Sequence, residues 1–316
     1  MSATGQGSIS GDLSGRVAVV SGAGRGIGRA EALAMAAEGA SLVVNDLGCT
    51  PNGVGTAHGP ADEVVREIKA AGGQAVANYD SVATPEGAQR IIKTALDSFG
   101  RIDILVNNAG LVLPRHIIDM SIEDFDSVMK VNLYGTFYCI KFACEAMRQQ
   151  HYGRIINTSS EAGLGKVRRT AYSAAKEGIV GLTRSVARDM GPLGVTCNAV
   201  RPRASTRMIN EPDAVRMRKD LKDSGALDDL AGLESCMPEH VASLVTYLAS
   251  GHSANINGQV FMVGGNAIKM YAEPVSPAKF LYARGAGWSY RELIDVMPET
   301  LAKEVVNPAP ANRDQK

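Results

Sequence analysis

A tyrosine and a lysine stand four residues apart in the stretch A-Y-S-A-A-K, as Tyr172 and Lys176. In a helix this spacing places the two side chains on one face. A phenol with an ordinary pKa near 10 is a poor acid or base at neutral pH, but a neighbouring ammonium favours the phenolate and lowers that pKa. No other tyrosine of the sequence has a lysine four positions after it. The pair is therefore a candidate for moving a proton.

A glycine-rich turn, S-G-A-G-R-G-I-G, occupies positions 21–28 between an expected first strand and an expected first helix. Glycines let the backbone approach a pyrophosphate closely, and the N-terminus of the following helix offers free N–H groups. The spacing through Gly22, Gly26 and Gly28 is G-x-x-x-G-x-G, which differs from the better known G-x-G-x-x-G. A merely tight turn is the alternative interpretation. The position between strand and helix favours a dinucleotide, and the lack of a following Gly-Lys-Ser/Thr excludes a P-loop ATPase.

Asp46 closes the expected second strand. A carboxylate at this place accepts hydrogen bonds from the adenosine ribose hydroxyls and repels a 2′-phosphate, which predicts NAD as the cofactor in preference to NADP. Arg25 in the glycine turn could assist a phosphate, so NADP stays open. The other interpretation of Asp46 is a turn residue before Leu47 and Gly48.

An alternation of strands and helices must position these residues. Helices of ten or more residues between strands require crossover connections, which produce a parallel sheet. We therefore expect an α/β fold, a Rossmann-type doubly wound parallel sheet of about seven strands in a single domain with a C-terminal extension. The expected strands are 16–21, 41–46, 74–79, 103–106, 154–158, 195–200 and 259–263, and the main expected helices are 27–38, 61–71, 87–99, 132–149 and 171–189.

The chain shows no repeat and no linker before position 265. We expect a flexible leader over 1–12, the Rossmann-type domain over 13–266 with a substrate loop at 203–236, and a C-terminal extension over 267–316. Apolar residues recur at helical spacing between 288 and 305, which predicts an amphipathic helix that buries one face against this domain or a neighbouring subunit. Such an extension is expected to wall the substrate mouth or cross a subunit interface.

Composition excludes several classes of protein. Lys plus Arg and Asp plus Glu both number 33, so the zero net charge argues against nucleic-acid and membrane partners. Hydrophobic residues make up 45% and charged residues 21%, enough for a sizeable core. The absence of an apolar run of membrane-spanning length and of a signal-like start predicts a cytoplasmic protein. Five scattered cysteines and five scattered histidines predict reduced thiols and no metal site.

Over residues 13–265 the chain resembles the short-chain dehydrogenase/reductases. Any one motif could be accidental, whereas the ordered set is highly specific. The motifs are S-G-A-G-R-G-I-G, the strand-end Asp46, Asp80 in N-Y-D-S-V, N-N-A-G at 107–110, Asn132 in V-N-L-Y-G, Ser160 in T-S-S-E-A-G and Y-S-A-A-K.

The resemblance implies roles for individual residues. Tyr172 would be the general acid/base, and Lys176 would lower its pKa and hold the nicotinamide ribose. Ser160 would hydrogen-bond the reacting oxygen, and Asn132 would hold a water that links Lys176 to solvent. Asp80 would meet the adenine and Asn108 would stabilise the sheet beside the cofactor. The cofactor contacts implied as a set are Gly22, Arg25, Gly26, Ile27, Gly28, Asp46, Asp80, Ser81, Asn108, Ala109, Gly110, Tyr172, Lys176, Pro202 and Thr206.

Four longer stretches, among them V-V-N-D-L-G and F-G-R-I-D-I-L-V-N-N-A-G, resemble the (3R)-hydroxyacyl-CoA dehydrogenase unit of multifunctional β-oxidation enzymes and bacterial sterol or hydroxysteroid dehydrogenases. This implies lipid metabolism, with an NAD-dependent oxidoreductase interconverting a secondary alcohol and a ketone on a bulky apolar substrate. An NADP-linked 3-oxoacyl reductase and a catalytically silent dinucleotide-binding sensor or scaffold are the alternatives. The family usually forms homo-oligomers, tetramers or dimers, through the two long helices near 132–149 and 171–189.

The sequence departs from the family pattern near the expected catalytic residues. Ser160 precedes Tyr172 by 12 residues, which is one fewer than is usual in the family. Because Ser159 is adjacent, the identity of the catalytic serine is open. Pro202 is followed by Arg203 where the family has glycine, which weakens the expectation that Thr206 binds the carboxamide. Cations at positions 203, 207, 216, 218, 219 and 222 could receive a CoA phosphate, but the acids among them favour a solvated charged helix.

Overall fold

The computed structural model describes residues 11–50, 52–206, 236–272, 279, 281 and 290–303. The chain divides into two compact units, Met1–Tyr271 and Ala272–Lys316. The first unit contains the sheet and all the motifs named above.

The first unit is built on one sheet of eight strands in the order β3-β2-β1-β4-β5-β6-β7-β8. The first seven strands are parallel, and β8 is antiparallel to β7. The chain runs outward from β1 to β3 and then returns to β4 on the other side of β1, so a topological switch point lies between β1 and β4. The strands are β1 (Val17–Ser21), β2 (Ser41–Asn45), β3 (Ala75–Asn78), β4 (Ile104–Asn107), β5 (Gly153–Thr158), β6 (Val195–Pro202), β7 (Val260–Gly264) and β8 (Ala267–Met270).

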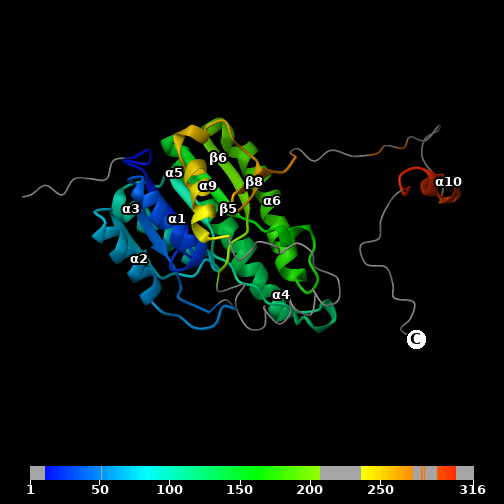
Figure 1. Cartoon of the computed structure of the whole chain (residues 1–316), viewed down its shortest axis with the longest axis horizontal. Helices are drawn as coiled ribbons and strands as arrows, with labels where there is room; N and C mark the ends of the chain where they lie inside the picture. The colour runs from blue at the N-terminus through cyan, green and yellow to red at the C-terminus, as the bar shows by residue number, and fades with distance from the viewer. Residues whose placement is uncertain are drawn as a thin grey trace, which may run out of the picture. The chain divides into compact units, whose positions relative to one another are not determined.

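Helices cover both faces of the sheet (Figure 1). One face is packed by α1 (Gly26–Ala37), α2 (Gly59–Ala70) and α9 (Pro238–Ala249). The other is packed by α3 (Pro85–Phe99), α5 (Gly135–Gln150) and α6 (Thr170–Met190). The doubly wound α/β architecture expected from the sequence is confirmed.

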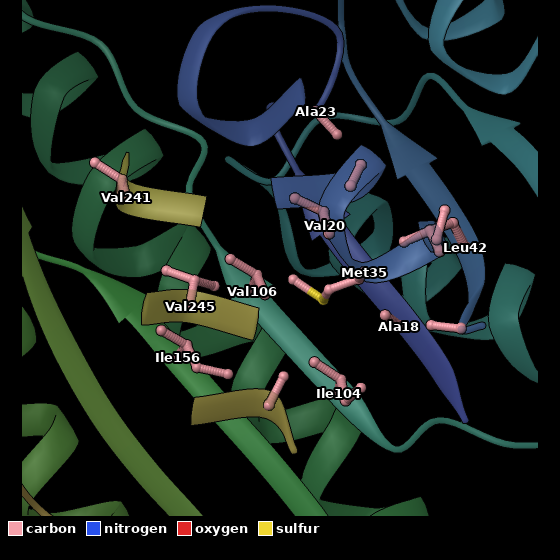
Figure 2. Packing of buried hydrophobic residues seen from close by; sticks show 14 of the residues in the cluster. Ala18, Val20, Ala23, Met35, Leu42, Ile104, Val106, Ile156, Val241 and Val245 are labelled. Atoms are coloured by element: carbon pink, nitrogen blue, oxygen red, sulfur yellow. The ribbon is translucent and has the colours of Figure 1, made fainter. Parts of the chain in front are cut away.

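The two faces of each strand belong to two separate cores. Val17 and Val19 of β1 pack with α3 and α5, whereas Ala18 and Val20 pack with α1 and α9. Figure 2 shows the core on the side of α1 and α9, in which Met35 of α1 lies among side chains of the central strands. Burial on both faces explains why the middle residues of these strands are mostly apolar on both sides.

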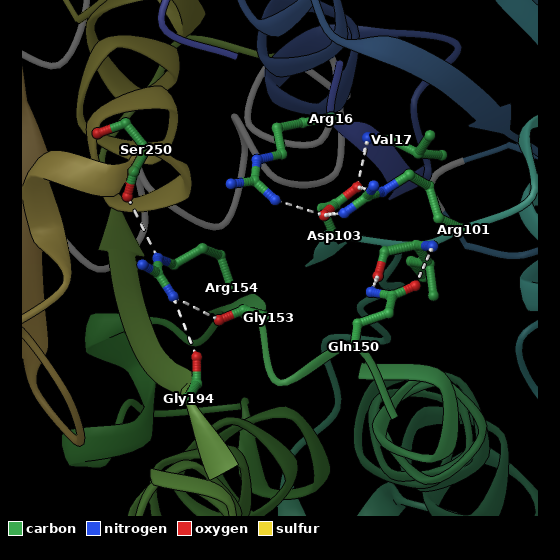
Figure 3. A network of polar contacts seen from close by, with 10 residues as sticks. Arg16, Val17, Arg101, Asp103, Gln150, Gly153, Arg154, Gly194 and Ser250 are labelled. Atoms are coloured by element: carbon green, nitrogen blue, oxygen red, sulfur yellow. Dashed lines mark hydrogen bonds and ion pairs between the residues drawn. The ribbon is translucent and has the colours of Figure 1, made fainter. Parts of the chain in front are cut away.

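An ionic cluster closes the amino-terminal edge of the sheet (Figure 3). The fully buried Asp103 carboxylate accepts hydrogen bonds from Arg16 Nη1 at 2.9 Å, Arg101 Nε at 2.7 Å and the Val17 N–H at 3.0 Å. The guanidinium groups of Arg16 and Arg154 lie 3.7 Å and 4.4 Å from the centre of the Tyr152 ring. These contacts tie together the starts of β1, β4 and β5, at the edge opposite to the glycine turn.

The structure differs from the sequence expectations in the strand count and in one helix. Strand β8 extends the sheet beyond the expected last strand and beyond the expected boundary at 266. Most of its side chains are exposed, so no burial pattern marks it in the sequence. The helix expected over 132–149 begins with a π-helical turn, η2 (Lys130–Tyr134), which continues α4 (Ile122–Met129) before α5. Positions 207–235 of the expected substrate loop lie outside the described residues.

The second unit contains a short helix, α10 (Tyr290–Val296), followed by the 3-10 turn η7 (Met297–Glu299). Its described helical part is shorter than the helix expected over 288–305. The role of this extension stays a prediction. Within the residues that the structure describes, no helix is long and apolar enough to cross a membrane.

Candidate active site

The glycine turn lies at the carboxyl end of β1, beside the switch point. Gly22 and Gly26 have φ angles of 65° and 55°, in the left-handed region that residues with a side chain rarely adopt. A Cβ at Gly28 would collide with the Gly22 carbonyl oxygen and with Asn108 Nδ2. The turn therefore requires glycine at these positions to hold its tight shape. Arg25 is exposed, and Ile27 is the second residue of α1.

Asn108 and Ser21 join the turn to the end of β4. Asn108 Nδ2 donates to the carbonyl oxygens of Ser21 and Gly22 at 3.0 and 3.1 Å. Ser21 Oγ accepts the N–H groups of Asn108 and Ala109 at 3.2 and 3.1 Å. The S-G-A-G-R-G-I-G and N-N-A-G motifs thus form one assembly across the switch point. Ser21 was not singled out from the sequence, although its place at the strand end, ahead of Gly22, was a usable signal.

Asp46 is buried against the glycine turn. Its Oδ2 accepts the Gly24 N–H at 2.7 Å and its Oδ1 accepts the Gly48 N–H at 2.6 Å. The bond to Gly48 is typical of an aspartate in a turn, as the second interpretation of Asp46 predicts. The bond to Gly24 also places the carboxylate beside the turn, where a ribose would lie if the turn held a dinucleotide.

The ends of β2 and β3 carry a second polar group of residues. Asp80 accepts hydrogen bonds from Arg90 Nε at 2.7 Å and from Asn78 Nδ2 at 3.0 Å. Tyr79 stacks on His58 with ring centres 3.8 Å apart. Ser81 accepts the Ala83 N–H at 3.2 Å. The His58–Tyr79 pair was missed from the sequence because its members come from different loops.

Lys176 is buried and points at the end of β5. Its Nζ donates to the Thr158 carbonyl oxygen at 2.7 Å and lies 5.4 Å from the centre of the Tyr172 ring. Burial lowers the pKa of Lys176 to about 7. An amine with this pKa can gain or lose a proton near neutral pH.

Tyr172 lies beside Ser160 and Arg169. Burial raises the pKa of Tyr172, while the positive charge of Arg169 and the hydrogen bond with Ser160 act in the opposite direction. Arg169 and Ser160 are thus the groups that oppose the rise in the pKa of Tyr172. The sequence had predicted this role for Lys176. Arg169 was missed because it precedes the Y-S-A-A-K motif and carries no motif of its own.

The two adjacent serines have different partners. Ser159 is buried and its Oγ donates to the Lys176 carbonyl oxygen at 2.7 Å. Ser160 hydrogen-bonds Tyr172 and also accepts the Ala162 N–H at 3.1 Å. Of the two, Ser160 is therefore the serine placed at the phenol.

Asn132 lies in the π-helical turn, a distortion that often occurs at functional sites. Its Nδ2 donates to the carbonyl oxygens of Leu111 and Val128, both at 2.9 Å. Its buried Oδ1 has no hydrogen-bond partner within the described part of the chain. A Cβ added to Gly110 would lie 2.6 Å from this oxygen and 3.5 Å from Lys176 Nζ. Gly110 thus leaves a space between an unpaired acceptor and an amine, and a water molecule can bridge such groups.

The end of β6 brings the last expected contacts to the site. Pro202 is its final residue. The methyl group of Thr206 would lie 3.5 Å from a Cβ built on Gly26. Thr206 therefore reaches back to the glycine turn, and Arg207 lies outside the described residues.

Arg203, which replaces the glycine of the family pattern, forms an ion pair with the residue after Ser160. Its Nε and Nη2 donate to Glu161 Oε2 and Oε1 at 2.5 and 3.1 Å. Bidentate pairing of this kind fixes both side chains geometrically. The departure from the family pattern thus links the end of β6 to the loop that carries Ser160.

Breaking this ion pair is expected to disturb catalysis more than cofactor binding. Arg203→Ala frees Glu161 and loosens the Ser160 loop, so we expect kcat to fall roughly tenfold with little change in dinucleotide affinity. Glu161→Gln should have a similar effect, and the double variant should lose little more than either single variant. Steady-state kinetics of the three variants check this, and fully additive losses would contradict it.

Together these residues fit a dinucleotide followed by a reacting alcohol or ketone. The glycine turn could accept phosphates, Asp46 lies where a ribose would follow, and the unpaired Asn132 oxygen and Lys176 amine border the space left by Gly110. No group of three or more His, Cys, Asp or Glu side chains suited to a metal is present in the described ranges.

Comparisons with known proteins agree with this geometry. A family model described as Enoyl-(Acyl carrier protein) reductase matches residues 22–265. The chain is 44% identical over 260 residues to a putative short-chain type dehydrogenase/reductase, Rv0148, of Mycobacterium tuberculosis, covering 81% of this chain and 85% of that protein. It is 39% identical over 304 residues to the hydroxyacyl-CoA dehydrogenase ChsB1 of the same organism, covering 92% and 90%.

A mouse relative and a solved structure extend the comparison. The peroxisomal multifunctional enzyme type 2 of Mus musculus is 43% identical over 255 residues, which cover 80% of this chain and 32% of the mouse protein. The chain thus spans about a third of that multifunctional enzyme. A crystal structure of a short chain dehydrogenase from Mycobacterium avium superposes with a TM-score of 0.78 at 40% identity, covering 95% of this chain and 99% of that one.

Proposed function

Because this chain belongs to the short-chain dehydrogenase/reductase family, whose members act on CH–OH groups, we propose that it is an NAD-dependent dehydrogenase of a bulky apolar secondary alcohol. The substrate class is a 3-hydroxyacyl-CoA or a hydroxysteroid-like alcohol, and the reaction is reversible to ketone reduction. The observation that carries the proposal is the grouping of Ser160, Tyr172, Lys176 and the unpaired Asn132 oxygen at one end of the sheet.

The chain's own residues supply binding and proton transfer. The glycine turn and Asp46 would hold the adenosine half of the dinucleotide, and Tyr172 and Lys176 would meet its other ribose. When bound, the nicotinamide supplies a two-electron acceptor for hydride. Ser160 would hydrogen-bond the substrate oxygen while Tyr172 removes the proton of the O–H group. The carbinol C–H bond breaks with its electron pair, and the C=O bond forms.

The proton taken by Tyr172 needs a route away from the site. Lys176 has a pKa of about 7, and the unpaired Asn132 oxygen lies across the space left by Gly110. A water held there would accept a proton from Lys176 and pass it on. Lys176 thus supports turnover by exchanging protons near neutral pH.

The preference for NAD is predicted to depend on Asp46. Asp46→Ala removes the charge that repels a 2′-phosphate, so we expect the ratio of NADP to NAD efficiency to rise tenfold or more. Asp97→Ala on the exposed face of α3 is the matched control and should leave the ratio unchanged. Kinetics with both cofactors check this, and a wild-type preference for NADP would contradict the assignment.

Two alternatives keep specific support. The exposed Arg25 in the glycine turn favours an NADP-linked 3-oxoacyl reductase. A catalytically silent sensor is suggested by Arg203 and by the short loop between Ser160 and Tyr172. A panel of 3-hydroxyacyl-CoA esters and hydroxysteroids, followed by absorbance of the reduced cofactor with NAD and with NADP, separates all three. Dinucleotide binding by fluorescence without turnover of any alcohol would favour the sensor.

The proposed enzyme is a homo-oligomer without a nucleic-acid or membrane partner. Phe137 of α5 and the preceding Tyr134 are exposed aromatic residues, and the ring of Tyr138 lies against both. Such a patch on a long helix is suited to pairing with a second copy. Light scattering of the wild type and of Phe137→Glu tests this proposal, since the charged variant should dissociate.

A further inference from the structure

The loop between Ser160 and Tyr172 carries a concentration of positive charge. Lys166, Arg168 and Arg169 fall within four residues, and the sequence from 162 to 176 contains no acidic residue. Lys166 and Arg168 are exposed, and neither side chain forms an ion pair or hydrogen bond with the rest of the described chain. The mechanism above uses neither of them.

A second segment of the chain holds this loop in place. The segment after β4 runs alongside it, through a parallel bridge between Arg115 and Arg169 and a hydrogen bond from the Arg115 N–H to the Arg168 carbonyl oxygen at 3.1 Å. Arg168 is held at a φ of 59°, an unfavourable value for a residue with a side chain. Arg115 thus adds a fourth cation at the same place.

Apolar side chains surround these cations. Leu164 and Val167 on the loop, and Ile117 and Ile118 two and three residues after the bridge, are 58 to 83% exposed. Isolated exposed apolar residues are common, but here four of them lie on the two segments that the Arg115–Arg169 bridge joins. The loop continues directly into α6, the helix that carries Tyr172, at Thr170.

The acidic side chains nearby only partly offset the cations. Asp124 approaches Arg115 at 3.4 Å, and Asp119 lies on the same segment. Glu161, at the start of the loop, is paired with Arg203. Lys166 and Arg168 therefore present positive charge that the described carboxylates do not neutralise.

We propose that Lys166 and Arg168, with Arg115 beside them, bind the phosphates of coenzyme A, so that the substrate is a CoA thioester. This inference rests on the proposed dehydrogenase function and selects one of its two substrate classes. Phosphates are recognised by Lys and Arg, and a hydroxysteroid without a CoA group has no charge that would use these cations.

The distances available along the chain suit this assignment. Lys166 is separated from Tyr172 by a turn, in which the Arg169 N–H donates to the Lys166 carbonyl oxygen at 3.2 Å, and by the start of α6 at Thr170. The Cα atoms of Lys166 and Tyr172 therefore lie within roughly 12 Å of each other. The Lys166 side chain can extend further from the phenol, toward phosphates at the far end of a pantetheine arm. The apolar side chains between the two ends would contact the arm and the acyl chain.

A pair of thioesters that share one acyl group tests the proposal. One is 3-hydroxydecanoyl-CoA, and the other is the N-acetylcysteamine ester of the same acid, which lacks the phosphates. For Lys166→Gln/Arg168→Gln we expect a loss of about tenfold in kcat/KM on the CoA ester, mostly in KM, and no loss on the short ester. The control Arg66→Gln/Lys69→Gln, two exposed cations of α2, should change neither.

Binding of CoA itself gives a readout that does not need turnover. Titration calorimetry of CoA into enzyme saturated with NADH, which fills the dinucleotide site, should show about tenfold weaker affinity in the loop variant than in wild type or the control. Equal losses on both esters, or equal CoA affinity in all three proteins, would overturn the inference. Preference for an acyl carrier protein thioester over the CoA ester would also overturn it. The dehydrogenase function itself fails only if no alcohol is oxidised at all.

Discussion

Tyr172→Phe is expected to lower turnover by about 10²- to 10⁴-fold while leaving NAD affinity nearly unchanged. The substitution removes only the phenolic oxygen, so the packing of the ring above Lys176 stays as it is. Steady-state kinetics give the loss, and cofactor fluorescence gives the affinity. Tyr247→Phe on the exposed side of α9 is the matched control and should behave as wild type.

The same role of Tyr172 predicts how the rate of alcohol oxidation depends on pH. Burial raises the pKa of Tyr172, and the hydrogen bond with Ser160 opposes that rise. The rate should therefore increase with pH as the phenolate forms. Ser160→Ala should move this increase to higher pH, because it removes a group that stabilises the phenolate. Retention of wild-type turnover in Tyr172→Phe would exclude the phenol as the proton acceptor.

The second large effect is expected on the free energy of unfolding, from the buried carboxyl group of Glu31 in α1. Its side chain is fully shielded from solvent, and neither carboxyl oxygen has a hydrogen-bond partner in the described ranges. Burial raises the pKa of Glu31 from 4.5 to about 8. The folded protein therefore keeps this proton between about pH 4.5 and 8, whereas the unfolded chain loses it.

Stability should fall as pH rises through this window, because the unfolded state binds fewer protons there. Glu31→Met removes the penalty and is expected to raise the free energy of unfolding at pH 7 by about 3 kcal/mol. Glu31→Gln should abolish the pH dependence while keeping a buried polar group. Urea unfolding at pH 5 and pH 7.5 measures both, with the exposed Glu63→Gln as control. A wild type and a Glu31→Gln variant with the same pH dependence would contradict this account.

The fold could be predicted to a large extent because the strands are buried on both faces. The runs V-A-V-V of β1 and L-V-V of β2 are apolar on both faces, and the helices between the strands are long enough to be recognised. Strand β8 could not be predicted in this way, since its exposed side chains follow no burial pattern. The π-helical turn at Asn132 was also hidden, because its residues continue the helical periodicity of α4 and α5.

The candidate site was predictable where a motif lies within one segment of sequence. Tyr172 and Lys176 share a helix, and the glycine turn is continuous. Contacts between distant segments gave no local signal: the Arg203–Glu161 pair, the His58–Tyr79 stack and the bridge from Arg115 to Arg169 join loops far apart in the chain. The choice between Ser159 and Ser160 needed the helix position of Lys176, whose carbonyl oxygen engages Ser159.

The most direct test of the account follows the hydrogen atom itself. A 3-hydroxyacyl-CoA deuterated at the carbinol carbon is mixed with the wild-type enzyme and NAD, and the reduced cofactor is analysed by mass spectrometry. We predict that deuterium appears in the reduced cofactor in equal amount to the ketone formed, and that Tyr172→Phe slows its appearance by at least a hundredfold. Tight binding of NAD without any deuterated cofactor, on this substrate and on deuterated hydroxysteroids, would contradict the assignment as a dehydrogenase.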